Sequence, residues 1–106
     1  MDEVQFNAAA EETLSAIERA LDACDEGLDY EVKPGGVLEL EFDDGSKIII
    51  NRHTAAREIW VAARSGGFHF KPDSGRWIGT RDGAELFEML SGLISRHAGT
   101  EIRLTP

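Results

Sequence analysis

The sequence contains a single cysteine, Cys24, among its 106 residues. One cysteine can form neither an internal disulfide nor a thiolate cage for a metal. No apolar run approaches the roughly 18 residues that a membrane span needs, and the N-terminus resembles neither a signal peptide nor a transit segment. We therefore expect a cytoplasmic protein with no membrane partner.

Basic residues are scarce, with 11 Lys and Arg against 20 Asp and Glu and a net charge of -9. Binding to nucleic acid needs clustered Lys and Arg, so this class of partner is excluded as well. The length suits one domain with one core, and we expect a single domain over residues 1–106.

Recognisable catalytic patterns are also missing. We expect His53 on a turn, His69 on a strand and His97 packed on a helix, with no Ser or Cys nucleophile at a recognisable spacing. The glycine pairs 35–36 and 66–67 lack the context of a dinucleotide or phosphate loop. The sequence therefore predicts that the protein is not an enzyme.

The negative charge that is present lies almost entirely in the first third of the chain. Residues 1–31 carry ten carboxylates and one base, Arg19, whereas residues 32–106 balance ten acids with ten bases. Charge confined to one segment creates a directional field that attracts cations or basic partners. We therefore look for function in this segment.

Hydrophobic periodicity predicts an α+β fold, a two-layer sandwich of an antiparallel sheet with two helices on one face. A first helix is expected over roughly residues 3–25, stopped by Gly27, and a second is expected to start at a capping box of Asp82 and Glu85. Between them, alternating residues predict strands at 38–42, 47–52 and 58–63, followed by short strands at 68–70 and 76–78. The other sheet face is left to solvent.

The acids of the first helix share one edge. At 100° per residue, four of them fall within about 60° of one another. The candidate cation ligands are Glu11, Glu18, Asp22, Asp25 and Glu26, with Asp29 and Glu31 past the helix end. Oxygen ligands favour hard cations such as Ca²⁺, Mg²⁺, Mn²⁺ and iron, bound weakly at so exposed a site. The alternative is a solvated helix face, although repulsion between like charges counts against it.

Trp60 is the second candidate for function. Strand alternation turns it away from the core, toward the open sheet face beside Asn51 and near Arg52. An exposed Trp among polar donors and Arg is typical of a protein-binding hot spot. The alternative is that its neighbours shelter Trp60, which then only stiffens the sheet.

Four blocks of the sequence are similar to a known family. They are G-G-V-L at 35–38, F-x-x-G-S-K-I-I-I-N-R at 42–52, I-W-V-A at 59–62 and G-G-F-H-F at 66–70. Through these blocks the chain resembles the bacterial frataxin (CyaY) family over nearly its whole length. The G-S-K-I-I-I-N-R block is highly specific.

The resemblance implies a two-layer sandwich that binds iron (Fe²⁺ or Fe³⁺) weakly and acts in iron–sulfur cluster assembly. By position it implies iron contacts at Glu11, Glu18, Asp22, Asp25, Asp29 and Glu31, and contacts of Asn51, Arg52 and Trp60 with a cysteine desulfurase and its scaffold protein. We expect a monomer, with iron-dependent oligomers left open. The competing hypotheses are an iron store or ferroxidase and a simple divalent-cation buffer.

Overall fold

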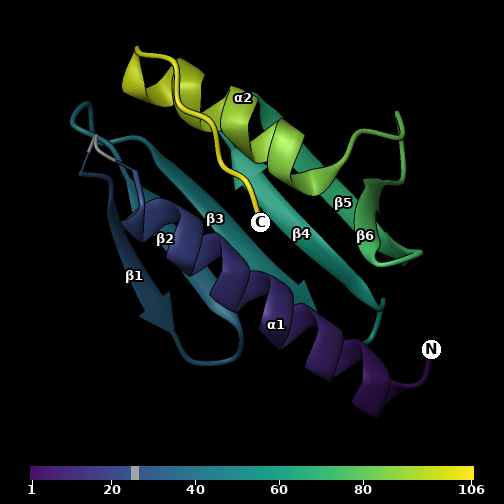
Figure 1. The fold of residues 1–106 in the computed structure, drawn as a ribbon. Helices are drawn as coiled ribbons and strands as arrows, with labels where there is room; N and C mark the ends of the chain where they lie inside the picture. The colour runs from purple at the N-terminus through teal and green to yellow at the C-terminus, as the bar shows by residue number, and fades with distance from the viewer. Residues whose placement is uncertain (25–26) are drawn as a thin grey trace.

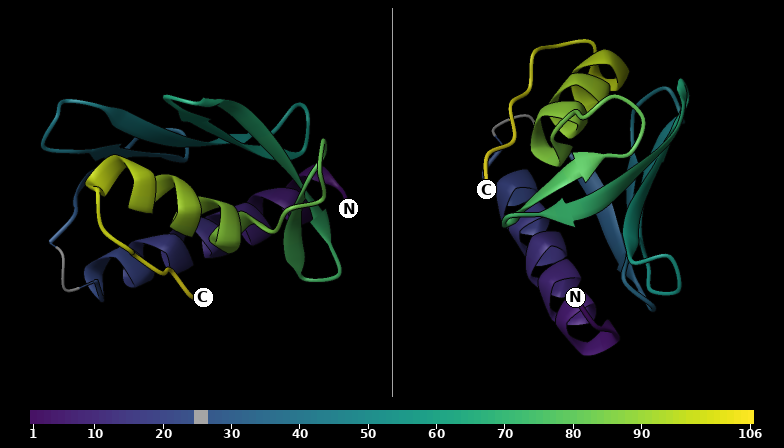
Figure 2. Two further views of the ribbon diagram at one scale, coloured as in Figure 1. Left: turned by 90° about the horizontal axis from the view of Figure 1, so that it is seen from above. Right: turned by 90° about the vertical axis from the view of Figure 1, so that its right-hand side faces the viewer.

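The computed structural model describes residues 1–24 and 27–106 and shows two helices on one face of a six-stranded antiparallel sheet (Figures 1 and 2). The elements in chain order are α1 (Glu3–Asp22), β1 (Asp29–Lys33), β2 (Val37–Glu41), β3 (Lys47–His53), β4 (Glu58–Ala63), β5 (Gly66–Asp73), β6 (Arg76–Gly79) and α2 (Leu86–Ala98). The strands follow one another across the sheet from β1 to β6. This confirms the predicted α+β sandwich.

The core lies between the sheet and the helices. The predicted stripe of α1 is buried at Phe6, Ala10, Leu14, Ile17 and Leu21, and Cys24 is half-buried against the same cluster. Alternate strand residues meet this stripe, as Leu38, Leu40, Ile48, Ile50, Ile59 and Val61 are all buried. The residues between them point to the open sheet face, where function is expected.

Both helices depart from the prediction at one end. α1 stops at Asp22 with Ala23 as its C-cap, so Gly27 lies beyond the helix end. The predicted capping box was wrong: the N-cap of α2 is Glu85, whose carboxylate accepts hydrogen bonds from the amides of Phe87 and Glu88. Gly83 has a φ of +74°, and this left-handed turn prevents a helix from starting at residue 82.

Two strands were also incompletely predicted. β1 is an edge strand in which only Tyr30 is half-buried, so it carries no alternating hydrophobic signal. β5 is longer than expected, because Gly66 and Gly67 pair with Ala63 and Ala62 of β4 instead of forming a bend. The missed β1 matters for function, since it carries two of the candidate acids.

The C-terminal tail, residues 100–106, returns along α2 toward α1 (Figure 1). Its amides at Ile102 and Leu104 each donate a 2.8 Å hydrogen bond, to Ser95 Oγ and Ser91 Oγ respectively. Both tail side chains are buried in the core cluster. Among the described residues, no helix combines the length and the apolar character that crossing a membrane requires.

Candidate functional site

The candidate acids lie on α1 and on the edge strand β1. We call Glu11, Glu18, Asp22, Asp29 and Glu31 the acidic edge; Asp25 and Glu26, also predicted, lie outside the described residues. A direct contact joins the two elements, because the hydroxyl of Tyr30 on β1 donates a 2.6 Å hydrogen bond to Oδ1 of Asp22. This bond, the partial burial of Tyr30 and the charges of Asp22 and Glu18 raise the pKa of Tyr30 to about 12.

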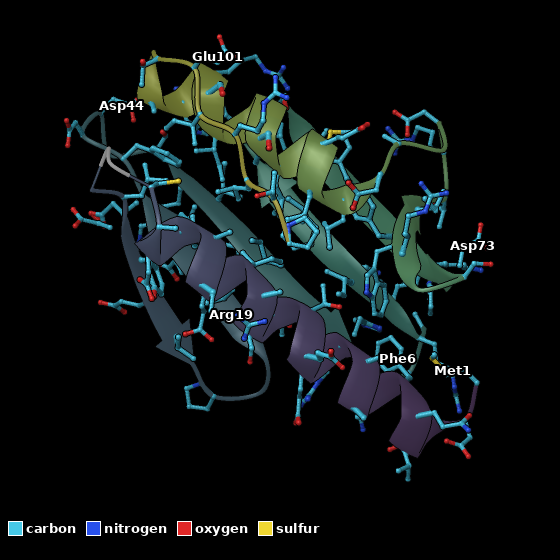
Figure 3. All side chains as sticks on the ribbon, in the orientation of Figure 1. Met1, Phe6, Arg19, Asp44, Asp73 and Glu101 are labelled. Atoms are coloured by element: carbon cyan, nitrogen blue, oxygen red, sulfur yellow. The ribbon has the colours of Figure 1, made fainter. Side chains whose placement is uncertain are left out.

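Most of the acidic edge forms no ion pair with the protein's own bases, although Lys33 and Lys47 lie near enough to Glu31 to interact with its charge. Glu11 pairs with Arg52 at 3.1 Å. Within residues 1–24 and 27–106, Glu18, Asp22, Asp29 and Glu31 form no ion pair with any base. Arg19, labelled in Figure 3, forms none with the described acids either. The negative field predicted from the sequence therefore persists in the folded protein.

Strand alternation divides the acidic edge into two groups. Tyr30 faces α1, so its neighbours Asp29 and Glu31 point to the opposite, open face of the sheet. On that face Glu39 accepts contacts of 2.8 Å from both Lys33 and Lys47, which lower the pKa of Glu39 to about 2. The carboxylates of α1 and of β1 thus lie on opposite faces of the edge strand.

The arrangement suits a loosely held cation better than a resident metal. Across the described part of the chain, no three Asp, Glu, His or Cys side chains converge on a point that could hold a metal ion. The available ligands are carboxylate oxygens, the donors that hard cations prefer; Glu18 is half-buried and the other described members of the acidic edge are exposed. Because these oxygens do not converge, the geometry predicts weak binding of any such cation.

The second candidate surface surrounds Trp60 on the open sheet face. Asn51 lies directly across from Trp60, as predicted. Arg52 does not share this face: it follows Asn51 in β3, turns toward α1 and contacts Glu11. The structure therefore separates Arg52 from the two residues with which it was grouped.

Sequence reasoning missed the neighbours of Trp60. His53, predicted on a turn, is the last residue of β3, and its ring stacks on the indole at a centroid distance of 3.8 Å and an angle of 12°. His69 of β5 stacks on the other side at 4.4 Å and 7°. Glu58 accepts a 2.7 Å hydrogen bond from Trp60 Nε1. Correct strand registers would have revealed this cluster, because His69 is directly opposite Trp60.

Ser46 and His97 lie in contact although no catalytic triad is recognisable in the sequence. His97 Nδ1 lies 2.8 Å from Ser46 Oγ, and the Ser46 hydroxyl donates to Asp44 at 2.5 Å. A triad needs the histidine between the other two residues, whereas here the serine is in the middle. Burial lowers the pKa of His97, whose half-buried ring packs on Phe42. These contacts join the turn between β2 and β3 to α2.

Comparison with known proteins gives consistent matches. A family model for the frataxin-like domain matches residues 1–100. The iron-sulfur cluster assembly protein CyaY of Dechloromonas aromatica (strain RCB) is 61% identical over 104 residues, covering 98% of this chain and 99% of the relative. The protein of the same name from Vibrio cholerae serotype O1 is 45% identical over 102 residues, covering 96% and 97%.

Solved structures agree with these matches. Frataxin from Psychromonas ingrahamii superposes with a TM-score of 0.92 at 28% identity, over 100% of both chains. The trimeric frataxin from the yeast Saccharomyces cerevisiae, complexed with ferrous, has a TM-score of 0.66 at 24% identity, over 94% of this chain and 88% of that one. The yeast protein shares the fold.

Proposed function

Because the chain belongs to the frataxin family, we propose that it acts in iron–sulfur cluster assembly as a non-enzymatic, iron-binding adaptor. Relatives that match it over nearly their whole length are named for this process. In this proposal the protein works in the cytoplasm, binds iron weakly on the acidic edge and contacts a cysteine desulfurase and its scaffold protein.

The observation that carries the proposal is the excess negative charge of the acidic edge. Four carboxylates on two adjoining elements form no ion pair with the described bases. Such a surface attracts a basic patch on a partner protein over about a Debye length, roughly 8 Å at physiological salt. Bound iron neutralises some of these carboxylates and so weakens or redirects that contact. A yeast frataxin with the same fold has been solved with ferrous, which supports iron as the cation.

Trp60 and Asn51 supply the second contact in this proposal. Trp60 is half-buried at the centre of the open sheet face, and Asn51 lies across from it. Large aromatic residues at such positions often dominate the binding energy of an interface. Arg52 lies on the other face, where it bonds Glu11 of α1, so any contact it makes with a partner adjoins the acidic edge and not Trp60.

A charge-reversal triple variant, Glu18→Lys, Asp22→Lys and Asp25→Lys, tests the electrostatic contact. We expect it to abolish binding to the purified desulfurase at physiological salt and to reduce the uptake of Fe²⁺ in anaerobic calorimetry. The matched control is Asp73→Lys, Glu88→Lys and Glu101→Lys, which changes the net charge equally. Figure 3 places Asp73 and Glu101 away from the C-terminal half of α1.

The control should retain desulfurase binding within about threefold, a tolerance of well under 1 kcal/mol. Equal losses in both triple variants would show that total charge matters and its location does not. Oxygen consumption during aerobic iron addition tests the ferroxidase hypothesis. Turnover beyond the bound iron would replace the adaptor proposal with an enzymatic one.

A further inference from the structure

Trp60 is held in a stack of three rings that crosses three strands. His53 comes from β3, Trp60 from β4 and His69 from β5, and the interplanar angles of 12° and 7° make the rings nearly parallel. Stacked aromatic pairs stabilise a ring's position beyond the effect of the area they bury. The indole is therefore fixed by contacts on both of its faces.

Each ring of the stack also has a polar anchor. The amide of Ala56, in the turn after β3, donates a 3.3 Å hydrogen bond to His53 Nδ1. Glu58 Oε1 accepts from Trp60 Nε1 at 2.7 Å and lies 3.4 Å from His69 Nδ1. The Glu58 side chain is only 12% exposed, and its other oxygen lies 3.9 Å from Lys71 Nζ. Glu58 thus ties two of the three rings together.

These contacts restrict what Trp60 can offer to a partner. Imidazole rings cover both indole faces, and Glu58 occupies its one hydrogen-bond donor. Trp60 is nevertheless partly exposed, and with a ring stacked on each face its edge is the part most open to a partner. A partner arginine cannot stack on the indole face without displacing a histidine.

We propose that His53, Glu58 and His69 are positioning residues that present Trp60 edge-on, and that the partner receives this edge in an apolar slot. The proposal rests on the proposed function above, because it assumes that Trp60 contacts the assembly machinery. It adds the chemistry of the contact: a rigid, apolar ring edge instead of a cation–π pair or a hydrogen bond from the indole.

The test compares affinities for the purified complex of desulfurase and scaffold. The double variant His53→Ala and His69→Ala should bind about tenfold more weakly, as expected when two stacking contacts are lost. His53→Phe with His69→Phe keeps flat rings on both sides and should restore the affinity to within about threefold of the wild type. Ile102→Ala, a core variant in the tail, controls for a general loss of stability and should leave the affinity unchanged.

Fluorine NMR of protein labelled with 5-fluorotryptophan reports the position of the indole directly. The sequence has two tryptophans, so Trp60→Phe assigns the Trp60 resonance. This resonance should shift and narrow in the double alanine variant, because the ring becomes mobile. In the double phenylalanine variant its chemical shift and linewidth should again be close to those of the wild type. An unchanged resonance, or an unchanged affinity, in the double alanine variant would overturn the positioning role.

Trp60→Ala separates the inference from the proposed function. If Trp60→Ala binds like the wild type, both the sheet-face contact and the edge-on presentation are wrong. If Trp60→Ala loses affinity but the double alanine variant does not, only the positioning role fails. The loss caused by Trp60→Ala should also be the same at about 0.15 M and about 0.5 M salt, because an apolar contact is not screened. A loss that shrinks with salt would indicate a charged partner group and overturn the apolar slot.

Discussion

Tyr30 and Asp22 join the edge strand to the end of α1 through a single hydrogen bond of 2.6 Å. Asp22 is one of the candidate iron ligands, so the bond occupies one of its oxygens and fixes the carboxylate relative to β1. The same contact raises the pKa of Tyr30 to about 12, because ionisation of the phenol would place a second negative charge beside Asp22 and near Glu18.

The titration of Tyr30 can be measured without interference, because it is the only tyrosine in the chain. Its pKa is higher in the folded state than the ordinary value of 10. The stabilisation it provides is therefore complete below about pH 10 and is lost as the pH rises toward 12. Phenolate absorbance should show a midpoint near 12 in the wild type, and one closer to 10 in Asp22→Asn. Identical midpoints in the two proteins would contradict the assigned cause.

A second prediction concerns Gly36, which lies against Arg52. A Cβ on Gly36 would be 3.0 Å from the Cβ and Nε of Arg52, whereas a Cβ on Gly35 would meet nothing within 4 Å. Both glycines have a positive φ, of +77° and +86°, so alanine is strained at either position. We expect Gly35→Ala to lower the free energy of unfolding by about 1 kcal/mol and Gly36→Ala by about 2 kcal/mol or more.

Urea denaturation of the two variants provides the measurement, and Gly35→Ala is the matched control for backbone strain. The excess cost of Gly36→Ala arises from displacing Arg52 and weakening its bond to Glu11. Equal costs for the two substitutions would show that Arg52 moves aside freely and does not help to hold α1.

The fold was largely predictable because burial imposes a period on the sequence. The buried residues of α1 are three or four positions apart, and buried and less buried residues alternate in β2 through β4. Both patterns can be recognised in the sequence. β1 was not predicted, because an exposed edge strand requires no alternation of hydrophobic and polar residues. The start of α2 was misplaced because Asp82 and Glu85 have the spacing of a capping box, and only the left-handed turn at Gly83 shows that it cannot form.

The candidate site was predicted in composition but not in geometry. Segregated charge identified the acids of α1 directly from the sequence. That Asp29 and Glu31 face away from α1, and that Arg52 faces toward it, follows from strand registers that local patterns do not determine. The stack of His53, Trp60 and His69 depends on three strands at once and so emerges only from the fold.

A third prediction concerns the serines that hold the tail. Ser91 and Ser95 are one helical turn apart on α2. Their hydroxyl oxygens accept hydrogen bonds from the backbone amides of Leu104 and Ile102, respectively. Replacing both serines with alanine leaves two part-buried amides unpaired, at a cost of about 2–4 kcal/mol in the free energy of unfolding. Hydrogen exchange at the amides of Ile102 and Leu104 should become faster by the factor that corresponds to this loss of free energy. Ser65→Ala, at an exposed turn, is the control and should change neither measurement.

The last prediction concerns the link between α1 and β6. Trp77 Nε1 donates a 2.7 Å hydrogen bond to Thr13 Oγ1, and the Trp77 side chain is buried against Phe6 at an angle of 74°. Thr13→Val keeps the shape of the side chain but removes the acceptor, so the buried indole N–H is left unpaired at a cost of about 1–3 kcal/mol. In a Trp77→Phe background the same substitution should cost much less, because no donor remains to be satisfied. A double-mutant cycle measured by urea denaturation gives this coupling directly. If Thr13→Val were equally costly in both backgrounds, its effect would arise from packing within α1, and the hydrogen bond would contribute nothing to holding the helix on the sheet.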